Sequence, residues 1–380
     1  MNKEIYGESV SVSSHPVYVY IARLKVGTSS GIRAKVLNTV DSIRRQGRAC
    51  RADIVSSGGL GSVFKFIMTA VYAKEDVLII RSDHYSMLLL APVMLFKRLM
   101  GKIVIFDIAN PVRVSYRETW ARNEPVLMRL TKLSILLLSY PVAFFPAHRI
   151  HEYGNEGWLA SLGVRRKIVL VGNAANTRGI SYRTRVPPFE GTQLVFGMAG
   201  HVAYFHGVDR FIRSMASYLL EKKGADDCVI RLNVVGGGFE INTLKKLSQD
   251  LGVAKYVEFI DEVPLSALEG FFDAIHVGLC SLAQCRKGIY LNSDLKSRDM
   301  AARGVPFVLA IEDPDFRSAN LDAIYIIPND ESIIDLNKII KWYGAVNEMN
   351  RLELRKFAVE KLDFDAKVAP IINFAEGKLC

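Results

Sequence analysis

Hydrophobic and polar positions follow two alternating patterns along the chain. Short apolar runs, typical of buried strands, are separated by longer stretches with the helical period of about 3.6 residues. The expected strands are 17–22, 77–82, 102–108, 142–147, 167–174, 194–200, 229–238, 255–263, 276–282, 306–311 and 324–329. The expected helices are 32–46, 85–100, 124–139, 208–222, 240–251, 266–274 and 293–303, with a mostly helical tail over 331–377. This alternation predicts an α/β fold with parallel sheets covered by helices.

Residues 175–191 interrupt the pattern, because they hold two prolines and have no apolar period. We therefore expect two doubly wound, Rossmann-like units, over 1–180 and 190–360, that face a cleft. A last helix over 361–380 is expected to pack back on the first unit. The length of 380 residues suits two domains, and a hydrophobic content of 50% predicts a large buried core.

The cysteines and the apolar runs bear on the cellular compartment. The five cysteines are scattered without a paired spacing, which favours reduced thiols in a cytoplasmic protein. The first residues are polar and carry no apolar signal core. The longest apolar runs, 85–96 and 133–145, are shorter than the roughly 20 residues of a membrane-spanning helix. We expect them to be buried, although attachment to a membrane surface stays open.

Charge is distributed unevenly between the two halves. Residues 1–190 contain 27 Lys and Arg against 13 Asp and Glu, whereas residues 191–380 contain 22 against 26. The basic half suggests an acidic partner, such as anionic lipid headgroups or a phosphorylated acceptor, with an ordinary basic surface as the alternative. Nucleic acid is not expected as a partner, because the basic residues do not form one arm and no binding motif is present.

Residues 292–308 predict a phosphate-binding helix. Ser293 is a suitable N-cap, and the first-turn amides and helix dipole favour an anion there. Lys296 adds a positive charge, and Asp299 follows one turn later with a carboxylate able to accept ribose hydroxyl protons. These groups suit a nucleotide diphosphate. The alternative is an ordinary capped surface helix.

Three glycine-rich or strand-end segments precede this helix and are expected to face the same crevice. In 197–212, a strand ends in glycines and a loop with two histidines follows; in 234–240, a strand runs into three glycines; and 259–282 places a short helix between two strands. Glycines permit close approach of a backbone to phosphate. No G-x-G-x-x-G with its acidic partner is present, so a nicotinamide site is poorly supported. The expected nucleotide-binding residues of this unit are Gly200, His201, His206, Gly236, Gly237, Ser293, Lys296 and Asp299.

The order of these segments resembles the nucleotide-sugar-binding domain of family 4 retaining glycosyltransferases, which have the GT-B fold. The matching strings are G-M-A-G-H-V-A-Y-F-H-G-V-D, V-V-G-G-G-F-E, V-E-F-I-D-E-V, H-V-G-L-C-S-L and S-D-L-K-S-R-D-M-A-A-R-G-V-P-F-V. The last string is similar to a branch that acts on cell-surface polysaccharides. The resemblance covers residues 193–310 and implies an acceptor-binding first unit. It implies transfer of a sugar from a nucleotide-diphosphate donor to a saccharide or lipid-linked acceptor in capsule, O-antigen or lipopolysaccharide synthesis. The basic and apolar composition of the first unit fits an acceptor carried on a lipid diphosphate at the cytoplasmic membrane surface.

The chain departs from the family pattern at several positions. Of the two glutamates usual in the family, one falls on Leu291 and the other on Asp299. The basic pair that usually grips the diphosphate falls on His201 and His206. Lys296, Arg286 and Lys287 are candidates to supply the missing charge. A non-catalytic nucleotide-sugar-binding protein is therefore the alternative, and a GT-B epimerase or a pyridoxal-phosphate-dependent phosphorylase is a third class.

The first unit offers candidates for the acceptor side. The loop 27–31, including Gly31, corresponds to a family loop near the donor phosphates. Residues 81–84 and 107–111 end strands, and either Asp83 or His84 could position an acceptor hydroxyl. A helix cap or a turn is the alternative for each. With Lys296, they complete the expected catalytic set, and Asn173 resembles the segment that ends the family's first domain.

Two D-x-D strings, 313–315 and 363–365, have the form of a metal-binding pair. We expect them to be coincidental, because the first contains proline and the second lies in the helical tail. The GT-B resemblance implies that helix amides and side-chain cations act in place of a metal, so no metal and no further cofactor is expected.

Overall fold

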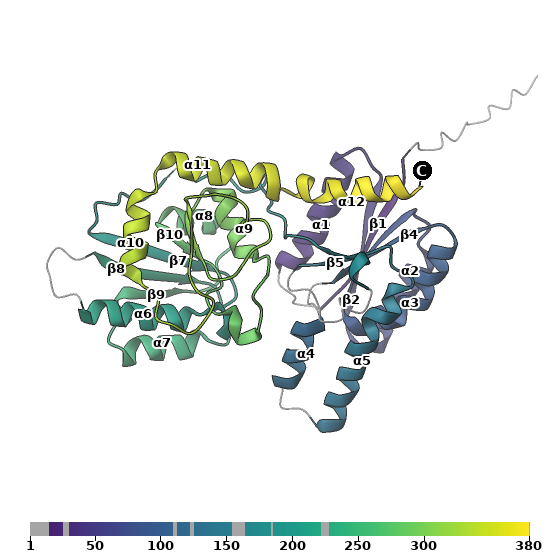
Figure 1. The fold of residues 1–380 in the computed structure, drawn as a ribbon, viewed down its shortest axis with the longest axis horizontal. Helices are drawn as coiled ribbons and strands as arrows, with labels where there is room; N and C mark the ends of the chain where they lie inside the picture. Colours follow the sequence, from purple (N-terminus) through teal and green to yellow (C-terminus); the bar gives the residue numbers. More distant parts are fainter. Residues whose placement is uncertain are drawn as a thin grey trace, which may run out of the picture.

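A computed structural model describes residues 15–25, 30–108, 112–121, 125–153, 164–183, 185–221 and 228–379. It contains two six-stranded parallel sheets, each with helices on both faces (Figure 1). The first domain is built from β1 (Tyr18–Lys25), α1 (Ser30–Arg45), β2 (Cys50–Ser57), α2 (Gly59–Tyr72), β3 (Val77–Ser82), α3 (His84–Leu99), β4 (Ile103–Ile108), α4 (Val112–Ala121), α5 (Val126–Phe144), β5 (Arg149–Glu152) and β6 (Ile168–Leu170). Its strand order is β2-β1-β3-β4-β5-β6.

The second domain continues the alternation of strands and helices. Its elements are β7 (Gln193–Ala199), α6 (Val208–Glu221), β8 (Val229–Val235), α7 (Ile241–Asp250), β9 (Val257–Ile260), α8 (Leu265–Asp273), β10 (Val277–Leu279), α9 (Leu295–Arg303), β11 (Phe307–Leu309), β12 (Ile324–Ile326), α10 (Leu336–Ala345) and α11 (Glu348–Phe357). The order β9-β8-β7-β10-β11-β12 reverses direction between β7 and β10. The predicted two-sheet α/β architecture is confirmed.

The last helix, α12 (Phe364–Leu379), returns to the first domain and packs against α1 (Figure 1). Val368, Ile372 and Ala375 join Val36 and Val40 of α1 in one buried core. The opposite face of the first sheet is covered by α2, α3 and α5, which share a second core. One face of the first sheet therefore depends on residues from the other end of the chain.

The expected strand over 142–147 is wrong. Helix α5 runs to Phe144, and strand β5 begins only at Arg149. Ala143 and Ala147 are fully buried in the first-domain core, so the apolar run is the buried end of a helix. A short apolar run alone does not distinguish a buried strand from a buried helix end.

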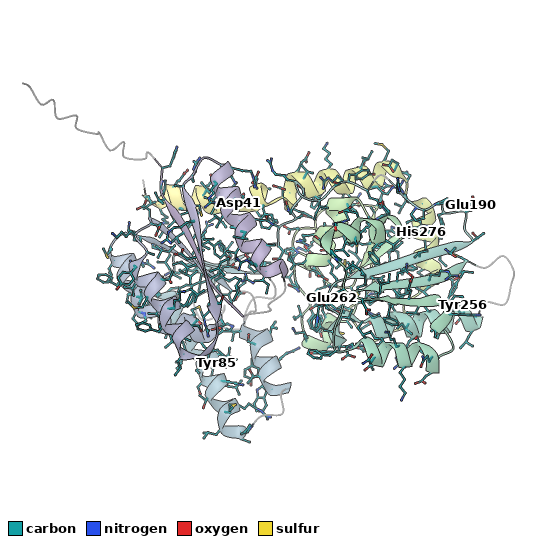
Figure 2. All side chains as sticks on the ribbon, turned by 180° about the vertical axis from the view of Figure 1, so that it is seen from behind. Asp41, Tyr85, Glu190, Tyr256, Glu262 and His276 are labelled. Carbon is teal, nitrogen blue, oxygen red and sulfur yellow. The ribbon has the colours of Figure 1, made fainter. Side chains whose placement is uncertain are left out.

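The carboxyl ends of both sheets face the boundary between the domains. Glu262, just beyond the carboxyl end of β9, lies on the side of the second domain that faces the first, whereas Tyr256, just before β9, lies farther away (Figure 2). On the other side, Tyr153 follows β5 and its carbonyl accepts the amide hydrogen of Ser293 at 3.0 Å. Residues that follow the strands of both sheets therefore meet, which is where ligands bind in folds of this class.

Candidate active site

The second sheet has its topological switch point between β7 and β10, where neighbouring chain segments diverge and leave a crevice. Strand β7 leads into Gly200, and β10 leads into Cys280 and Ser281. The amide of Leu282 donates to the carbonyl of His206 at 3.0 Å, which holds together the loops on either side. Of the predicted nucleotide-binding residues, Gly200, His201 and His206 lie on the loop after β7, and Gly236 and Gly237 follow the neighbouring strand β8.

The glycines of the crevice hold two turns against each other. Gly200 and Gly236 have φ values of +105° and +124°, which L side chains rarely adopt. A Cβ on Gly236 would collide with the carbonyl of Gly200, whereas one on Gly237 would meet the carboxylate of Glu262. The amide of Val202 also donates to the Gly237 carbonyl at 2.8 Å. The absent side chains therefore permit backbone-to-backbone packing that shapes one wall of the crevice.

Helix α9 begins beside this wall, and its N-cap is Asp294, not the predicted Ser293. The Asp294 carboxylate accepts the amide hydrogens of Lys296 at 3.1 Å and Ser281 at 2.9 Å. Burial opposes its charge, but Lys296 and the Ser281 bond outweigh burial and lower the pKa of Asp294. A permanent carboxylate thus already occupies part of the anion-favouring helix end. Lys296, not the helix end alone, must therefore supply the positive charge for a phosphate.

Lys296 and Asp299 both lie on α9, three residues apart. The Lys296 amine is 3.4 Å from the position that a Cβ on Gly200 would take, so it lies over the first glycine turn. The Asp299 side chain is exposed, but the protein atoms around it still displace part of its hydration and raise its pKa. The positive charges of Arg303 and Lys296 act in the opposite direction and do not cancel this effect. The structure therefore places a cation over the glycine turn and an exposed carboxylate one turn further along α9.

The two histidines differ in what they can do. His206 is buried, and burial together with nearby Lys296 lowers its pKa to about 3, so its ring is neutral near neutral pH. Its Nδ1 accepts the Ala203 amide hydrogen at 3.0 Å, which leaves Nε2 as the proton-bearing donor. His201 is exposed and packs edge-on against the ring of Phe239, with centroids 6.1 Å apart. The expected basic pair therefore includes one neutral hydrogen-bond donor.

Arg286 does not replace the missing charge. Its guanidinium pairs with both carboxylate oxygens of Asp209 at 2.8 Å and with both of Glu331 at 2.8 Å. These two carboxylates raise its pKa further above the usual range. The Lys287 amine lies over the ring of Phe205, 4.4 Å from the centroid. Arg286 thus fastens the loop after β10 to α6, and Lys296 remains the best-placed cation for a phosphate.

Ser293 belongs to a junction between the domains. Asn173 lies three residues beyond β6 and makes two hydrogen bonds to Ser293. Its backbone amide donates to Ser293 Oγ at 2.5 Å, and its side-chain Nδ2 donates to the Ser293 carbonyl at 2.6 Å. Its Oδ1 accepts from Lys35 Nζ at 3.0 Å, and its carbonyl accepts from Arg298 Nε at 3.0 Å. Asn173 therefore connects α1 with Ser293, which precedes the N-cap of α9, and with Arg298 in the first turn of α9.

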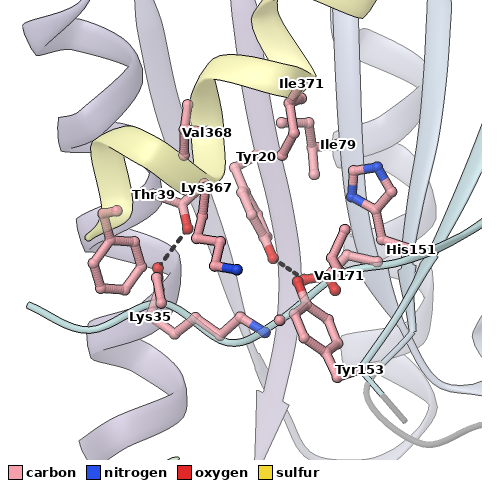
Figure 3. A pocket seen from close by; sticks show the side chains of 14 residues that line it. Tyr20, Lys35, Thr39, Ile79, His151, Tyr153, Val171, Lys367, Val368 and Ile371 are labelled. Atoms are coloured by element: carbon pink, nitrogen blue, oxygen red, sulfur yellow. Dashed lines mark hydrogen bonds between the residues drawn. The ribbon is translucent and has the colours of Figure 1, made fainter. Parts of the chain in front are cut away.

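A buried polar cluster lies behind this junction in the first domain (Figure 3). Asp107 of β4 accepts hydrogen bonds from Tyr20 and, at 3.0 Å, from Arg81. Burial opposes ionisation, but Lys35 and Arg81 hold the pKa of Asp107 well below its usual range. The adjoining cavity, of about 40 Å³, also has Lys35 and Tyr153 in its lining. A cavity this small suits one or two waters, so it is not a sugar site.

Lys35 was not expected from the sequence. Its amine lies 3.2 Å from the centroid of the Tyr153 ring, and burial lowers its pKa to about 7. Nothing in its local sequence distinguishes it from a lysine on the solvent face of a helix. Only the position of the residues after β5 and β6 in space brings it to the junction.

The acceptor-side predictions have different outcomes. Asp83 caps α3, because its carboxylate accepts the Ser86 amide hydrogen at 2.7 Å, but its side chain is 56% exposed and lies 3.8 Å from Arg23. His84 is buried, and its Nδ1 lies 3.1 Å from Ser139 Oγ of α5. The structure thus corrects the role of His84, whose ring packs into the first domain between α3 and α5. Gly31 lies exposed in the first turn of α1, and residues 27–29 of its loop lie outside the described residues.

The carboxylates of both D-x-D strings are engaged by basic or hydroxyl side chains. Arg298, which is fully buried, binds Asp313 and Asp315, and Lys367 also binds Asp315. Asp363 accepts from the hydroxyl of Thr177, and Asp365 pairs with Arg45 and Arg178. The first string anchors α9 and α12 beside the junction, which is a structural reason for its acidic residues.

The fold is similar to those of several solved glycosyltransferases. The lipopolysaccharide outer core galactosyltransferase WaaB aligns with a TM-score of 0.59 and 10% identity, over 95% of this chain and 100% of its own. A glycosyltransferase from Rickettsia africae aligns with a TM-score of 0.61 and 11% identity, over 96% and 99%. Sucrose-phosphate synthase from Thermosynechococcus elongatus aligns with a TM-score of 0.61 and 14% identity, over 94% and 98%.

No protein-family model matches the chain, and no curated protein matches its sequence. The likeness is therefore one of architecture: two parallel sheets whose carboxyl ends face each other, with the last helix returning to the first domain. The chain has the two-domain GT-B fold.

Proposed function

We propose that the protein is a glycosyltransferase that moves a sugar from a nucleotide-diphosphate sugar to a saccharide or lipid-linked acceptor. The observation that carries this proposal is the Lys296 amine, held over the Gly200 turn at the switch point of the second sheet. Asp299, one turn along α9, is accessible for ribose hydroxyls. We further propose retention of configuration and a role in cell-surface polysaccharide synthesis on the cytoplasmic side, on the basis of the motif order and fold.

The proposed chemistry is stabilisation of a leaving nucleotide diphosphate. Negative charge grows on its oxygens as the sugar departs, and a fixed cation beside them stabilises the transition state more than the ground state. Lys296 supplies this charge, and the Nε2–H of neutral His206 supplies a hydrogen bond without a second charge. The proposal requires no metal and no cofactor beyond the donor substrate.

The test is a thermal-shift screen against nucleotide sugars, followed by an assay for release of nucleotide diphosphate. A bound donor raises the melting temperature by mass action. Asp299→Ala should abolish the shift, and Lys296→Met should lower kcat by about 100-fold, a typical effect of losing one group that stabilises developing charge. Lys246→Met is the control, because Lys246 is exposed on α7. Full activity of Lys296→Met would contradict the proposal.

The alternative, a nucleotide-sugar-binding protein without transferase activity, is favoured by Leu291. This residue replaces an acidic side chain expected from the family pattern, and it forms a β-bridge with Glu312 beside the junction. Donor binding without nucleotide release from any donor and acceptor mixture would support this alternative.

A further inference from the structure

The outer side of the first domain exposes an unusual number of apolar side chains. Helices α2, α3 and α5 cover one face of the first sheet, with α3 in contact with both α2 and α5 (Figure 1). On α3, Tyr85, Leu89, Phe96 and Leu99 are exposed at a spacing that places them on one side of the helix. Tyr85 marks the start of this stripe in Figure 2. The inner side of the same helix is buried in the core.

Both neighbouring helices extend the apolar surface. On α2, Leu60 is 88% exposed and Phe64 is 65% exposed, four residues apart. On α5, the exposed apolar residues are Val126, Leu127, Met128, Leu130, Leu137, Leu138 and Val142, and Phe145 follows directly after the helix. Single exposed apolar side chains are common on proteins, but exposed apolar side chains gathered on three neighbouring helices mark an interaction surface. We call the outer side of α2, α3 and α5 the apolar face.

The charges of these three helices have one sign. Their sequences contain Lys65, Lys97, Arg98, Arg129 and Lys132 and no Asp or Glu. Lys97 is buried and donates to backbone carbonyls, so it adds no charge to the outer surface. Arg98 also donates to backbone carbonyls and not to carboxylates, so its charge stays uncompensated by those bonds. An apolar surface with only positive charges complements an anionic lipid surface, where apolar groups enter the acyl boundary and cations meet phosphates.

Helix α5 is suited to lie on a bilayer and not to cross it. Its 19 residues and mean hydropathy of 1.4 meet the length and composition expected of a membrane-spanning helix, with 24% of the span buried in the protein. However, Leu133, Leu136 and Ala143 form part of the core beneath the first sheet. Crossing a membrane would remove these residues from the core. If α5 lies in the membrane interface, only its outer side, which is not part of the core, contacts lipid.

We propose that the apolar face docks the protein on an anionic lipid bilayer. Helices α2 and α3 begin at the carboxyl ends of β2 and β3, so the face extends to the edge of the sheet that borders the domain boundary. Exposed Asp83 lies at that edge. Docking therefore brings the first domain's side of the crevice to the membrane, where it would meet a lipid-borne acceptor; this last step alone rests on the proposed function.

Vesicle co-sedimentation tests the docking without any sugar substrate. The protein should bind vesicles of phosphatidylcholine with about 30% phosphatidylglycerol and bind pure phosphatidylcholine vesicles far less, because anionic lipid adds attraction for each basic residue. The double variant Leu89→Glu with Phe96→Glu should lose at least about 10-fold in vesicle affinity. Leu220→Glu is the matched control, since Leu220 is 77% exposed on α6 of the second domain.

Charge is tested by Lys65→Glu against Lys246→Glu, both at exposed lysines. Only the first should weaken binding to the anionic vesicles. Absence of wild-type binding, or equal binding by all variants, would overturn the proposal. So would a dimer in size-exclusion chromatography that the double variant converts to a monomer, because the face would then bind a second copy. A variant that no longer binds vesicles but still transfers sugar to a soluble acceptor would show that membrane docking and the proposed transferase activity are independent.

Discussion

At the scale of single residues, the ionisation of the site is set by burial and by a few close partners. The Lys296 amine lies beside the glycine turn, whereas Asp294, which caps the same helix, stays ionised because Lys296 and Ser281 favour its charge. His206 stays neutral because a buried imidazolium beside Lys296 is unfavourable. The crevice thus combines one cation, one buried anion and one neutral donor within a short stretch of two loops.

Buried neutral histidines should make the fold sensitive to acid. Burial lowers the pKa values of His148 and His151 to about 4 and that of His206 to about 3. The unfolded chain takes up these protons near pH 6.5, so stability is full above about pH 6.5 and falls as the pH drops toward 4.

His206→Asn should reduce this sensitivity, because the Asn carbonyl can accept the Ala203 amide hydrogen without titrating. We expect the loss of unfolding free energy between about pH 7 and about pH 5 to be smaller by about 1–2 kcal/mol, measured by urea denaturation. His201→Asn, at an exposed site, should leave the pH dependence unchanged. Equal pH dependence of the His206 variant and the wild type would refute the assignment of a neutral buried ring.

At the scale of elements, the glycine turns are the parts of the site with the tightest packing. Gly236→Ala would place a Cβ against the Gly200 carbonyl at a positive φ, so either the turn or its neighbour must move. We expect a loss of about 2–4 kcal/mol in unfolding free energy and loss of the donor thermal shift. Gly252→Ala, at φ +70° but with open space around it, isolates the backbone effect, about 1 kcal/mol. Equal effects of both substitutions would show that the close packing is unimportant.

Much of the element order follows from the sequence, because strand and helix periods differ clearly in most segments. The N-cap of α9 lies one residue after the predicted Ser293, since Ser and Asp are equally good caps and only the Ser281 amide selects Asp294. His84 and Arg286 looked available for chemistry from their positions at the end of β3 and in the loop after β10. Their partners, Ser139 and Asp209, come from elements far along the chain, and local sequence carries no signal for such contacts.

At the scale of the whole molecule, the two domains are connected through one small set of polar groups. Asn173 connects Lys35 of α1 with Ser293 and Arg298 at the start of α9. Arg298 in turn binds Asp315, which Lys367 of α12 also binds. Elements from three distant parts of the chain therefore fix the position of the helix that carries Lys296.

Asn173→Ala should loosen this junction while both domains stay folded. We expect kcat to fall about 10-fold or more, because the junction orients the acceptor in the first domain against the donor in the second. The donor affinity should change little, because the proposed donor contacts all belong to the second domain. Steady-state kinetics and donor thermal shifts measure the two effects separately. Asn337→Ala on α10 is the control, since Asn337 lies on a helix away from the junction. A parallel loss of donor affinity would assign Asn173 to the binding site itself.

The return of α12 has a consequence for synthesis on the ribosome. The first sheet is complete once its last strand, β6, has emerged, but Val368, Ile372 and Ala375 still lie about 200 residues away in the unsynthesised chain. Until they arrive, the groove beside α1 stays uncovered, and the nascent first domain exposes part of its interior. The N-terminal domain is thus the last to complete its folding. A molecular chaperone that shields this groove during translation would bind incomplete nascent chains and not the completed protein.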